Sequence, residues 1–156
     1  MTWQDVYNEN RELDKLFLSF DDGLIIKKNK LELLVEIGEF ANETKCFKYW
    51  SKKEINLDNL KEELADCFIM CLSFYNYLDI KDIDSIKILD GDILSLFLKL
   101  YELGVSFAMD DCIVTIKEIF NILLNIGYKL KLTDSDMVDS CFKKINKDKA
   151  LMKEGY

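Results

Sequence analysis

Two stretches of this chain, ELLVEIGEFANET at residues 32–44 and LKEELADCF at residues 60–68, decide its fold. In both, apolar residues recur at the spacing of an α-helix, and acidic residues share one stripe between them. The acidic residues of the first stretch recur at i, i+4, i+7 and i+11: Glu32, Glu36, Glu39 and Glu43. In the second stretch, Glu63 and Asp66 lie three residues apart within an apolar run. Each helix therefore projects carboxylates in one direction.

Two antiparallel helices of this kind can bring Glu36, Glu39, Glu63 and Asp66 to one point. Four carboxylates repel one another at contact distance unless a cation neutralises them. A site made only of oxygen ligands suits Mg²⁺, with Mn²⁺ as a possible substitute, rather than zinc. The alternative is a solvated helix face, which is the usual fate of glutamates at this spacing.

The neighbours of each acidic residue favour the metal site over the solvated face. Glu39 lies between Gly38 and Phe40, and Asp66 lies between Ala65 and Cys67, so we expect both carboxylates to approach the interior. The acidic residues that we expect to face solvent are Glu32, Glu43 and Glu62.

The rest of the chain predicts an all-α protein, a bundle of about six helices in one domain over residues 1–156. Proline is absent and glycine is rare, and no stretch shows the alternation of a strand. The expected helices are 2–20, 29–45, 56–77, 90–109, 110–127 and a last one beginning at Thr133. Gly127 is expected to end the fifth helix as its C′ residue. In the second helix, the residues expected to face inward are Leu31, Leu34, Val35, Gly38 and Ala41.

Composition excludes several classes of function. The chain has no histidine, so Ser-His-Asp and Cys-His catalysis are excluded. A net charge of −8 argues against nucleic-acid binding. The five cysteines form no CxxC pair and fit reduced thiols. No stretch has membrane-spanning length and the N-terminus is unlike a signal peptide, so we expect a cytoplasmic protein without membrane contact.

At residues 32–44, followed by Phe47-Lys48-Tyr49-Trp50-Ser51, the chain resembles the dimeric all-α dUTPase family. Residues 62–66, EELAD, carry the same resemblance. The family belongs to a wider group of all-α NTP pyrophosphohydrolases that includes the MazG-like enzymes. The resemblance implies a homodimer that hydrolyses dUTP, and dUDP, to dUMP, with release of pyrophosphate or phosphate.

The resemblance also implies roles for individual residues. It implies that Glu36, Glu39, Glu63 and Asp66 coordinate Mg²⁺, with Glu39 orienting and deprotonating the attacking water. The residues that correspond to contacts with the nucleoside are Asn10, Asn42 and Trp50. Those that correspond to contacts with phosphate are Lys48, Lys144 and Tyr156.

Two departures from the family pattern bear on the substrate. The closing motif of the family carries an Asn and an Arg-Gln pair, where this chain has Asp148, Leu151 and Met152. Ile69 occupies a position where many members have histidine. Three alternatives therefore stay open: a pyrophosphohydrolase of another or broader set of nucleotides, a catalytically weak relative that binds or regulates, and a purely structural bundle.

Overall fold

The structure is a computed structural model that describes residues 1–20 and 23–155. Its secondary structure over these residues is entirely helical, which confirms the predicted all-α bundle. The helices are α1 (Trp3–Phe17), α2 (Ile25–Thr44), α3 (Leu57–Tyr77), α4 (Ile93–Met109), α5 (Ile113–Lys129) and α6 (Asp134–Lys153). A 3₁₀ turn, η1 (Leu18–Phe20), follows α1. None of the described helices combines the length and apolar character needed to cross a membrane.

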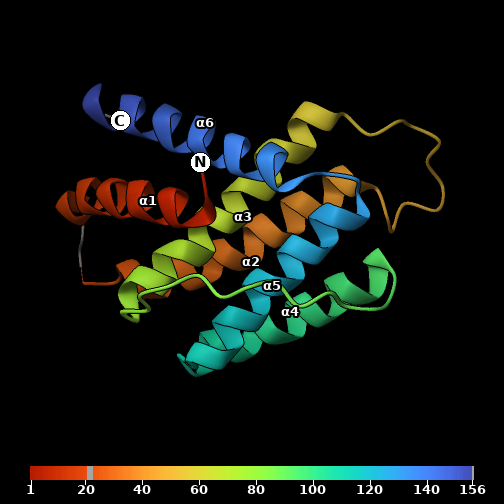
Figure 1. Ribbon diagram of the computed structural model, residues 1–156, viewed down its shortest axis with the longest axis horizontal. Helices are drawn as coiled ribbons and strands as arrows, with labels where there is room; N and C mark the ends of the chain where they lie inside the picture. The colour runs from red at the N-terminus through yellow and green to blue at the C-terminus, as the bar shows by residue number, and fades with distance from the viewer. Residues whose placement is uncertain (21–22, 156) are drawn as a thin grey trace.

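Helix α3 is the centre of the bundle. It packs against α1, α2, α5 and α6, while α4 lies on the outer side of α2 and α5 (Figure 1). The position of α3 follows from its sequence, since Leu60, Leu64, Phe68, Leu72 and Tyr75 are all buried in a helix that has apolar residues on several sides. A carboxylate on α3 can therefore face a neighbouring helix rather than water.

Two capping boxes define the starts of α1 and α6. Thr2 and Asp5 exchange side-chain to backbone hydrogen bonds at the start of α1. Thr133 and Asp136 do the same at the start of α6. Each box satisfies two backbone N–H groups that have no partner within the helix.

Gly127 does not end its helix, so that prediction was wrong. It lies inside α5, where a Cβ atom would clash with the Met137 sulfur on α6 and lie 3.4 Å from Leu64 Cδ2 on α3. The glycine is thus required by the close approach of three helices rather than by a left-handed cap.

The inward face predicted for α2 was also partly wrong. The residues that face the core are Leu33, Ile37, Phe40 and Ala41. Leu34 and Gly38 face α4, where the Leu34 side chain approaches Gly104 and a Cβ on Gly38 would lie 2.8 Å from the Tyr101 hydroxyl. Leu31 and Val35 remain 66% and 48% exposed. A helix packed against two neighbours has more apolar positions than the core uses. The helical periodicity of the sequence alone does not show which of these positions are buried.

We expect Gly127→Val to reduce the free energy of unfolding by about 2 kcal/mol, because overpacking a helix contact forces neighbouring side chains from their positions. Urea denaturation followed by circular dichroism measures the change. The control is Glu118→Val on the exposed side of the same helix. Equal stability of the two variants would contradict the close packing at Gly127.

Candidate functional site

Three of the four predicted metal ligands meet between α2 and α3. Glu36, Glu39 and Glu63 each offer a carboxylate oxygen, and these three oxygens lie within 4.8 Å of one another. Glu36 and Glu63 are partly buried, while Glu39 is exposed, in contrast to the expectation that it approaches the interior. Glu36 and Glu39 share one face of α2 because residues three apart in a helix are neighbours, and the two residues between them lie on other faces.

The electrostatics of these carboxylates are those of an unneutralised cluster. Burial, together with the nearby Asp66 and Glu39 carboxylates, raises the pKa of Glu36 to about 8. The same causes raise the pKa of Glu63 to about 7. Among the described residues, Glu36 Oε2 and Glu63 Oε2 are buried and accept no hydrogen bond. A buried carboxylate oxygen without a donor is costly, so these two atoms are suited to a cation.

Asp66 is the fourth ligand predicted from the sequence, and it faces α6. Its carboxylate lies 3.3 Å from Lys144 Nζ, and Asp148 Oδ1 lies 3.9 Å from the same nitrogen. Burial raises the pKa of Asp66 to about 6 even though Lys144 lowers it. Burial lowers the pKa of Lys144, but the neighbouring Asp66 and Asp148 carboxylates raise it by more. The pKa of the lysine therefore lies above its usual value. Lys144 therefore neutralises one side of the acidic cluster.

A cavity of about 490 Å³ extends from this cluster between α1, α2 and α3. Glu36, Asp66 and Asp148 line one part of it, and Asp14, Ser73 and Asn76 line another. The apolar lining residues include Leu13, Phe17, Ile25, Ile26, Ile69 and Met70. The volume and the apolar walls with a few polar groups are typical of a site for a small organic ligand.

Glu32 is exposed, as the sequence predicts, and it also lines this cavity. Loss of surrounding water and repulsion from Asp66 and Asp148 raise its pKa. Glu32 precedes Glu36 by one turn, and this turn of α2 runs along the cavity rather than away from it.

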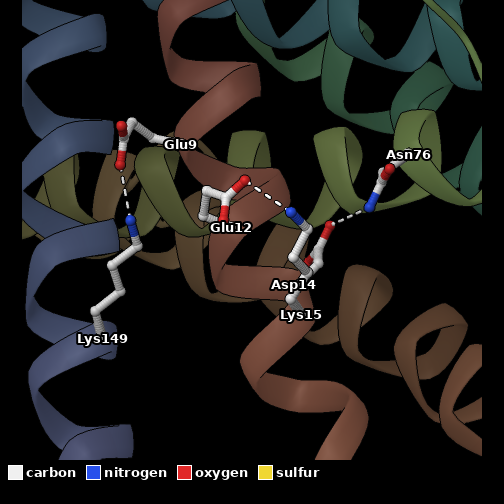
Figure 2. Close-up of polar contacts among 6 residues, drawn as sticks. All are labelled: Glu9, Glu12, Asp14, Lys15, Asn76 and Lys149. Carbon is white, nitrogen blue, oxygen red and sulfur yellow. Dashed lines mark hydrogen bonds and ion pairs between the residues drawn. The ribbon is translucent and has the colours of Figure 1, made fainter.

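A buried hydrogen-bond network organises the other part of the cavity. Asp14 accepts hydrogen bonds from Ser73 Oγ at 2.7 Å and from Asn76 Nδ2 at 3.1 Å; Figure 2 shows the second of these. Ser73 Oγ in turn accepts from Asn10 Nδ2 at 3.1 Å. Asn10 is fully buried and its Oδ1 has no partner among the described residues. Burial raises the pKa of Asp14 against the opposing effect of its two donors.

Sequence reasoning found Asn10 in this network but missed Asp14, Ser73 and Asn76. The signal was present, because Ser73 and Asn76 continue the stripe of Glu63 and Asp66 on α3 at i+7 and i+10 from Asp66. Asp14 follows Asn10 by four residues and so lies on the same face of α1.

The clustered carboxylates and the adjoining cavity agree with the comparison with known families. A family model described as dUTPase matches residues 2–156. The chain belongs to this dUTPase family. It is accordingly a dUTP diphosphatase, a nucleoside triphosphate pyrophosphohydrolase that takes a nucleotide as its substrate. Enzymes of this kind generally use a divalent metal, typically Mg²⁺. No curated protein matches the chain.

None of the described residues that correspond to nucleotide contacts in dUTPases lines the cavity itself, although Asn10 and Lys144 contact Ser73 and Asp66, which do. Asn42 and Trp50 are exposed and do not line it. Lys48, in the loop after α2, lies 5.8 Å from the centre of the Phe47 ring. Tyr156 lies outside the described residues.

The closing motif of the family has an arginine that this chain lacks, and three lysines of α6, Lys147, Lys149 and Lys153, lie near that position. Two of them are engaged in ion pairs. Lys147 forms an ion pair with Glu62 at 3.0 Å. Lys149 pairs with Glu9 on α1 at 2.7 Å (Figure 2). Lys144, by contrast, faces the acidic cluster.

The raised pKa values predict how the stability of metal-free protein depends on pH. Glu36 and Glu63 titrate near pH 4.5 when unfolded and near pH 8 and 7 when folded, so the folded state binds more protons across this window. The free energy of unfolding should therefore fall as the pH rises from about 4.5 to 8.

We expect Glu36→Gln to reduce this fall and to raise the Tm at pH 8 by about 2–4 °C, which corresponds to about 1 kcal/mol for a chain of this size. Differential scanning calorimetry in EDTA measures it. Excess Mg²⁺ should raise the Tm of the wild-type protein more than that of the variant. A Tm that does not depend on pH between 5 and 8 would contradict the cluster.

Proposed function

We propose that this chain hydrolyses dUTP, and dUDP, to dUMP in a Mg²⁺-dependent reaction, releasing pyrophosphate or phosphate. The observation that carries the proposal is the meeting of Glu36, Glu39 and Glu63 next to a cavity of about 490 Å³. Membership of the dUTPase family supports dUTP as the substrate. We take residues 1–156 to be one catalytic domain, and we expect it to act in the cytoplasm as a homodimer.

The residues present fit a hard divalent cation. The donor set consists of carboxylate oxygens, and two of these oxygens are buried without a hydrogen-bond donor. Such donors suit Mg²⁺, with Mn²⁺ as a substitute. We propose that Glu36, Glu39, Glu63 and Asp66 hold the cation. Asp66 would exchange its present ion pair with Lys144 for a contact with the cation. When bound, the cation neutralises the carboxylates and polarises phosphate oxygens.

The chain's own residues then have distinct roles in the proposed reaction. Glu39 is the most exposed of the clustered carboxylates, and we propose that it orients a water molecule and accepts its proton. The water oxygen forms a bond to the α-phosphorus, and the bond from that phosphorus to the bridging oxygen breaks. The leaving pyrophosphate takes the bonding electrons. Lys144 provides positive charge for the phosphate groups.

The nucleoside fits the other part of the cavity. Asp14, Ser73 and Asn76 offer polar groups between apolar walls, as recognition of a base requires. Asn10 supports this set through Ser73. The contacts of Asn42, Trp50, Lys48 and Tyr156 with the nucleotide stay predictions.

A second candidate, hydrolysis of a broader set of nucleotides, is favoured by one observation. Asp148 adds a carboxylate beside Lys144, where the family pattern has an uncharged Asn, and Lys147 and Lys149 are held in ion pairs with Glu62 and Glu9. If the phosphates are recognised more weakly, selection of the substrate depends on the Asp14 network alone, and a broader set of nucleotides is accepted.

We expect Mg²⁺-dependent release of pyrophosphate from dUTP to exceed that from dCTP, dTTP and UTP by at least about tenfold in kcat/KM. Cytosine would leave buried polar groups unpaired, which costs more than about 1 kcal/mol. Thymine and UTP present the same polar edge of the base as dUTP, so they would be excluded by lack of space for the 5-methyl group and the 2′-hydroxyl. A coupled pyrophosphate assay with all four nucleotides measures this. Equal turnover would favour the broader enzyme. Tight binding without turnover in Mg²⁺ or Mn²⁺ would favour a binding or regulatory protein.

Glu39→Gln should lower kcat by about 10²–10⁴-fold, the usual effect of removing a general base. The matched control is Glu43→Gln, which removes a carboxylate from the next turn of α2 and should retain activity. Isothermal titration with Mg²⁺ separates the base from the ligand role. A structural bundle without a metal site would bind no Mg²⁺ in either variant or in the wild type.

A further inference from the structure

Lys144 on α6 forms an ion pair with one of the proposed metal ligands. Its Nζ lies 3.3 Å from Asp66 Oδ1, and Glu62 Oε1 and Asp148 Oδ1 lie 3.8 Å and 3.9 Å from the same nitrogen. The side chains of Lys144 and Asp66 are 20% and 16% exposed, so water screens this pair less than it screens a surface ion pair. The charge of Lys144 therefore compensates a carboxylate that is otherwise surrounded by other acids.

The position of Lys144 beside Asp66 opposes the binding of a cation there. Two positive charges close together repel each other most strongly where water screens them least. A divalent cation held by Asp66 would meet the charge of Lys144 across a single carboxylate. Asp66 is therefore a better metal ligand when Lys144 lies elsewhere.

The two other acids within reach of Lys144 differ in their surroundings. Glu62 already pairs with Lys147 at 3.0 Å and is 42% exposed. Asp148 lines the cavity, and within the described part of the chain its ion pair is with Lys144 alone. Lys144 and Asp148 are one turn apart on α6 and so share a face of this helix. A lysine that leaves Asp66 is thus retained by Asp148 at the edge of the cavity.

The part of the cavity beside Asp148 is acidic, since Glu32, Glu36 and Asp66 line it as well. Phosphate groups that enter this part meet repulsion from the carboxylates. A lysine next to Asp148 reduces that repulsion, and its flexible stem and three N–H donors suit phosphate oxygens. Phosphate groups in the cavity therefore favour the same position of Lys144 that a cation on Asp66 favours.

We propose that Lys144 is an exchangeable internal counter-ion. It pairs with Asp66 when no cation is bound, and it moves to Asp148 and the phosphate groups of the nucleotide when Asp66 binds a divalent cation. Each ligand then favours the position of Lys144 that the other requires, so the two bind cooperatively, and the coupling is reciprocal. The exchange rests on the proposed function, which supplies the metal ligands and a substrate with phosphate groups. Asp148 is a positioning residue that acts through Lys144.

A lysine that kept its place would act differently. Its charge would weaken cation binding and strengthen phosphate binding by fixed amounts, each independent of the other ligand. An exchangeable lysine instead contributes to phosphate binding only after the cation has taken its place on Asp66. The two arrangements therefore predict a different dependence of phosphate affinity on Mg²⁺.

Isothermal titration with inorganic triphosphate, in excess Mg²⁺ and in EDTA, measures this dependence. Lys144→Met removes the charge and keeps the length of the side chain. We expect it to weaken triphosphate binding at least about tenfold in Mg²⁺ but less than about twofold in EDTA, where the wild-type lysine is engaged by Asp66. The matched control is Lys147→Met, which removes a lysine of the same helix that pairs with Glu62 and should change neither affinity by more than about twofold.

A loss of affinity in EDTA that equals or exceeds the loss in Mg²⁺ would overturn the exchange, because a fixed lysine acts on the phosphates in both conditions. Equal affinity of the wild-type protein for triphosphate with and without Mg²⁺ would overturn it too. Triphosphate carries no base, so both results are independent of whether dUTP is the preferred substrate. Turnover of dUTP that requires Mg²⁺ would in either case leave the proposed function standing.

A double-mutant cycle on Mg²⁺ affinity, measured by isothermal titration without phosphate, tests the role of Asp148. Lys144→Met alone should strengthen Mg²⁺ binding at least about threefold, since no lysine then competes for Asp66. Asp148→Asn should weaken Mg²⁺ binding by a similar factor while Lys144 is present, because the lysine loses the acid that holds it away from Asp66. In the Lys144→Met background, Asp148→Asn should change the affinity by less than about twofold.

Equal effects of Asp148→Asn in the two backgrounds would contradict its action through Lys144, since an acid that acts only by its own charge gives additive changes. Unchanged or weaker Mg²⁺ binding by Lys144→Met would contradict the competition for Asp66. Circular dichroism checks that each variant is folded. Should the methionine variant not fold, Lys144→Gln gives the same cycle with a neutral side chain that can donate a hydrogen bond to Asp66.

Discussion

Repulsion among the carboxylates between α2 and α3 is the constraint on which the site depends. The carboxylate oxygens of Glu36, Glu39 and Glu63 are held within 4.8 Å of one another by helices whose other sides are fixed in the core. Leu33, Ile37 and Phe40 on α2 leave the glutamates no means of separating without loss of buried apolar area. The packing of the helices therefore maintains the repulsion between the carboxylates. A cation relieves it, and in its absence protonation does so, as the raised pKa values show.

The same constraint explains the position of Lys144. It is the cation of α6 nearest to the cluster and is mostly buried between Asp66 and Asp148. Because α6 also packs against α3, the lysine stays near the acids rather than extending into solvent. Its charge compensates Asp66 but leaves Glu36 and Glu63 with buried oxygens that have no donor. The cluster is thus neutralised on one side and open to a cation on the other.

Periodicity in the sequence predicted the all-α bundle and the meeting of the glutamates, because both follow from positions on a single helix and from one choice of neighbour. It could not predict which side of Glu32 or Glu39 the cavity occupies, since that depends on how α1 and α6 pack against α2 and α3. Gly127 shows the same limit. A glycine near a helix end fits a cap, but only the approach of Met137 and Leu64 reveals that the absent side chain makes room. Leu31 and Val35 have the right spacing for a core and nevertheless remain exposed.

The exposed positions follow from the position of α2 in the bundle. This helix has a side toward α3, a side toward α4 and a side along the cavity, and each of the three uses residues at helical spacing. Leu31 and Val35 lie on the boundary between the second and third sides. Apolar residues at that boundary contribute little to the stability of one chain, since they remain largely in water.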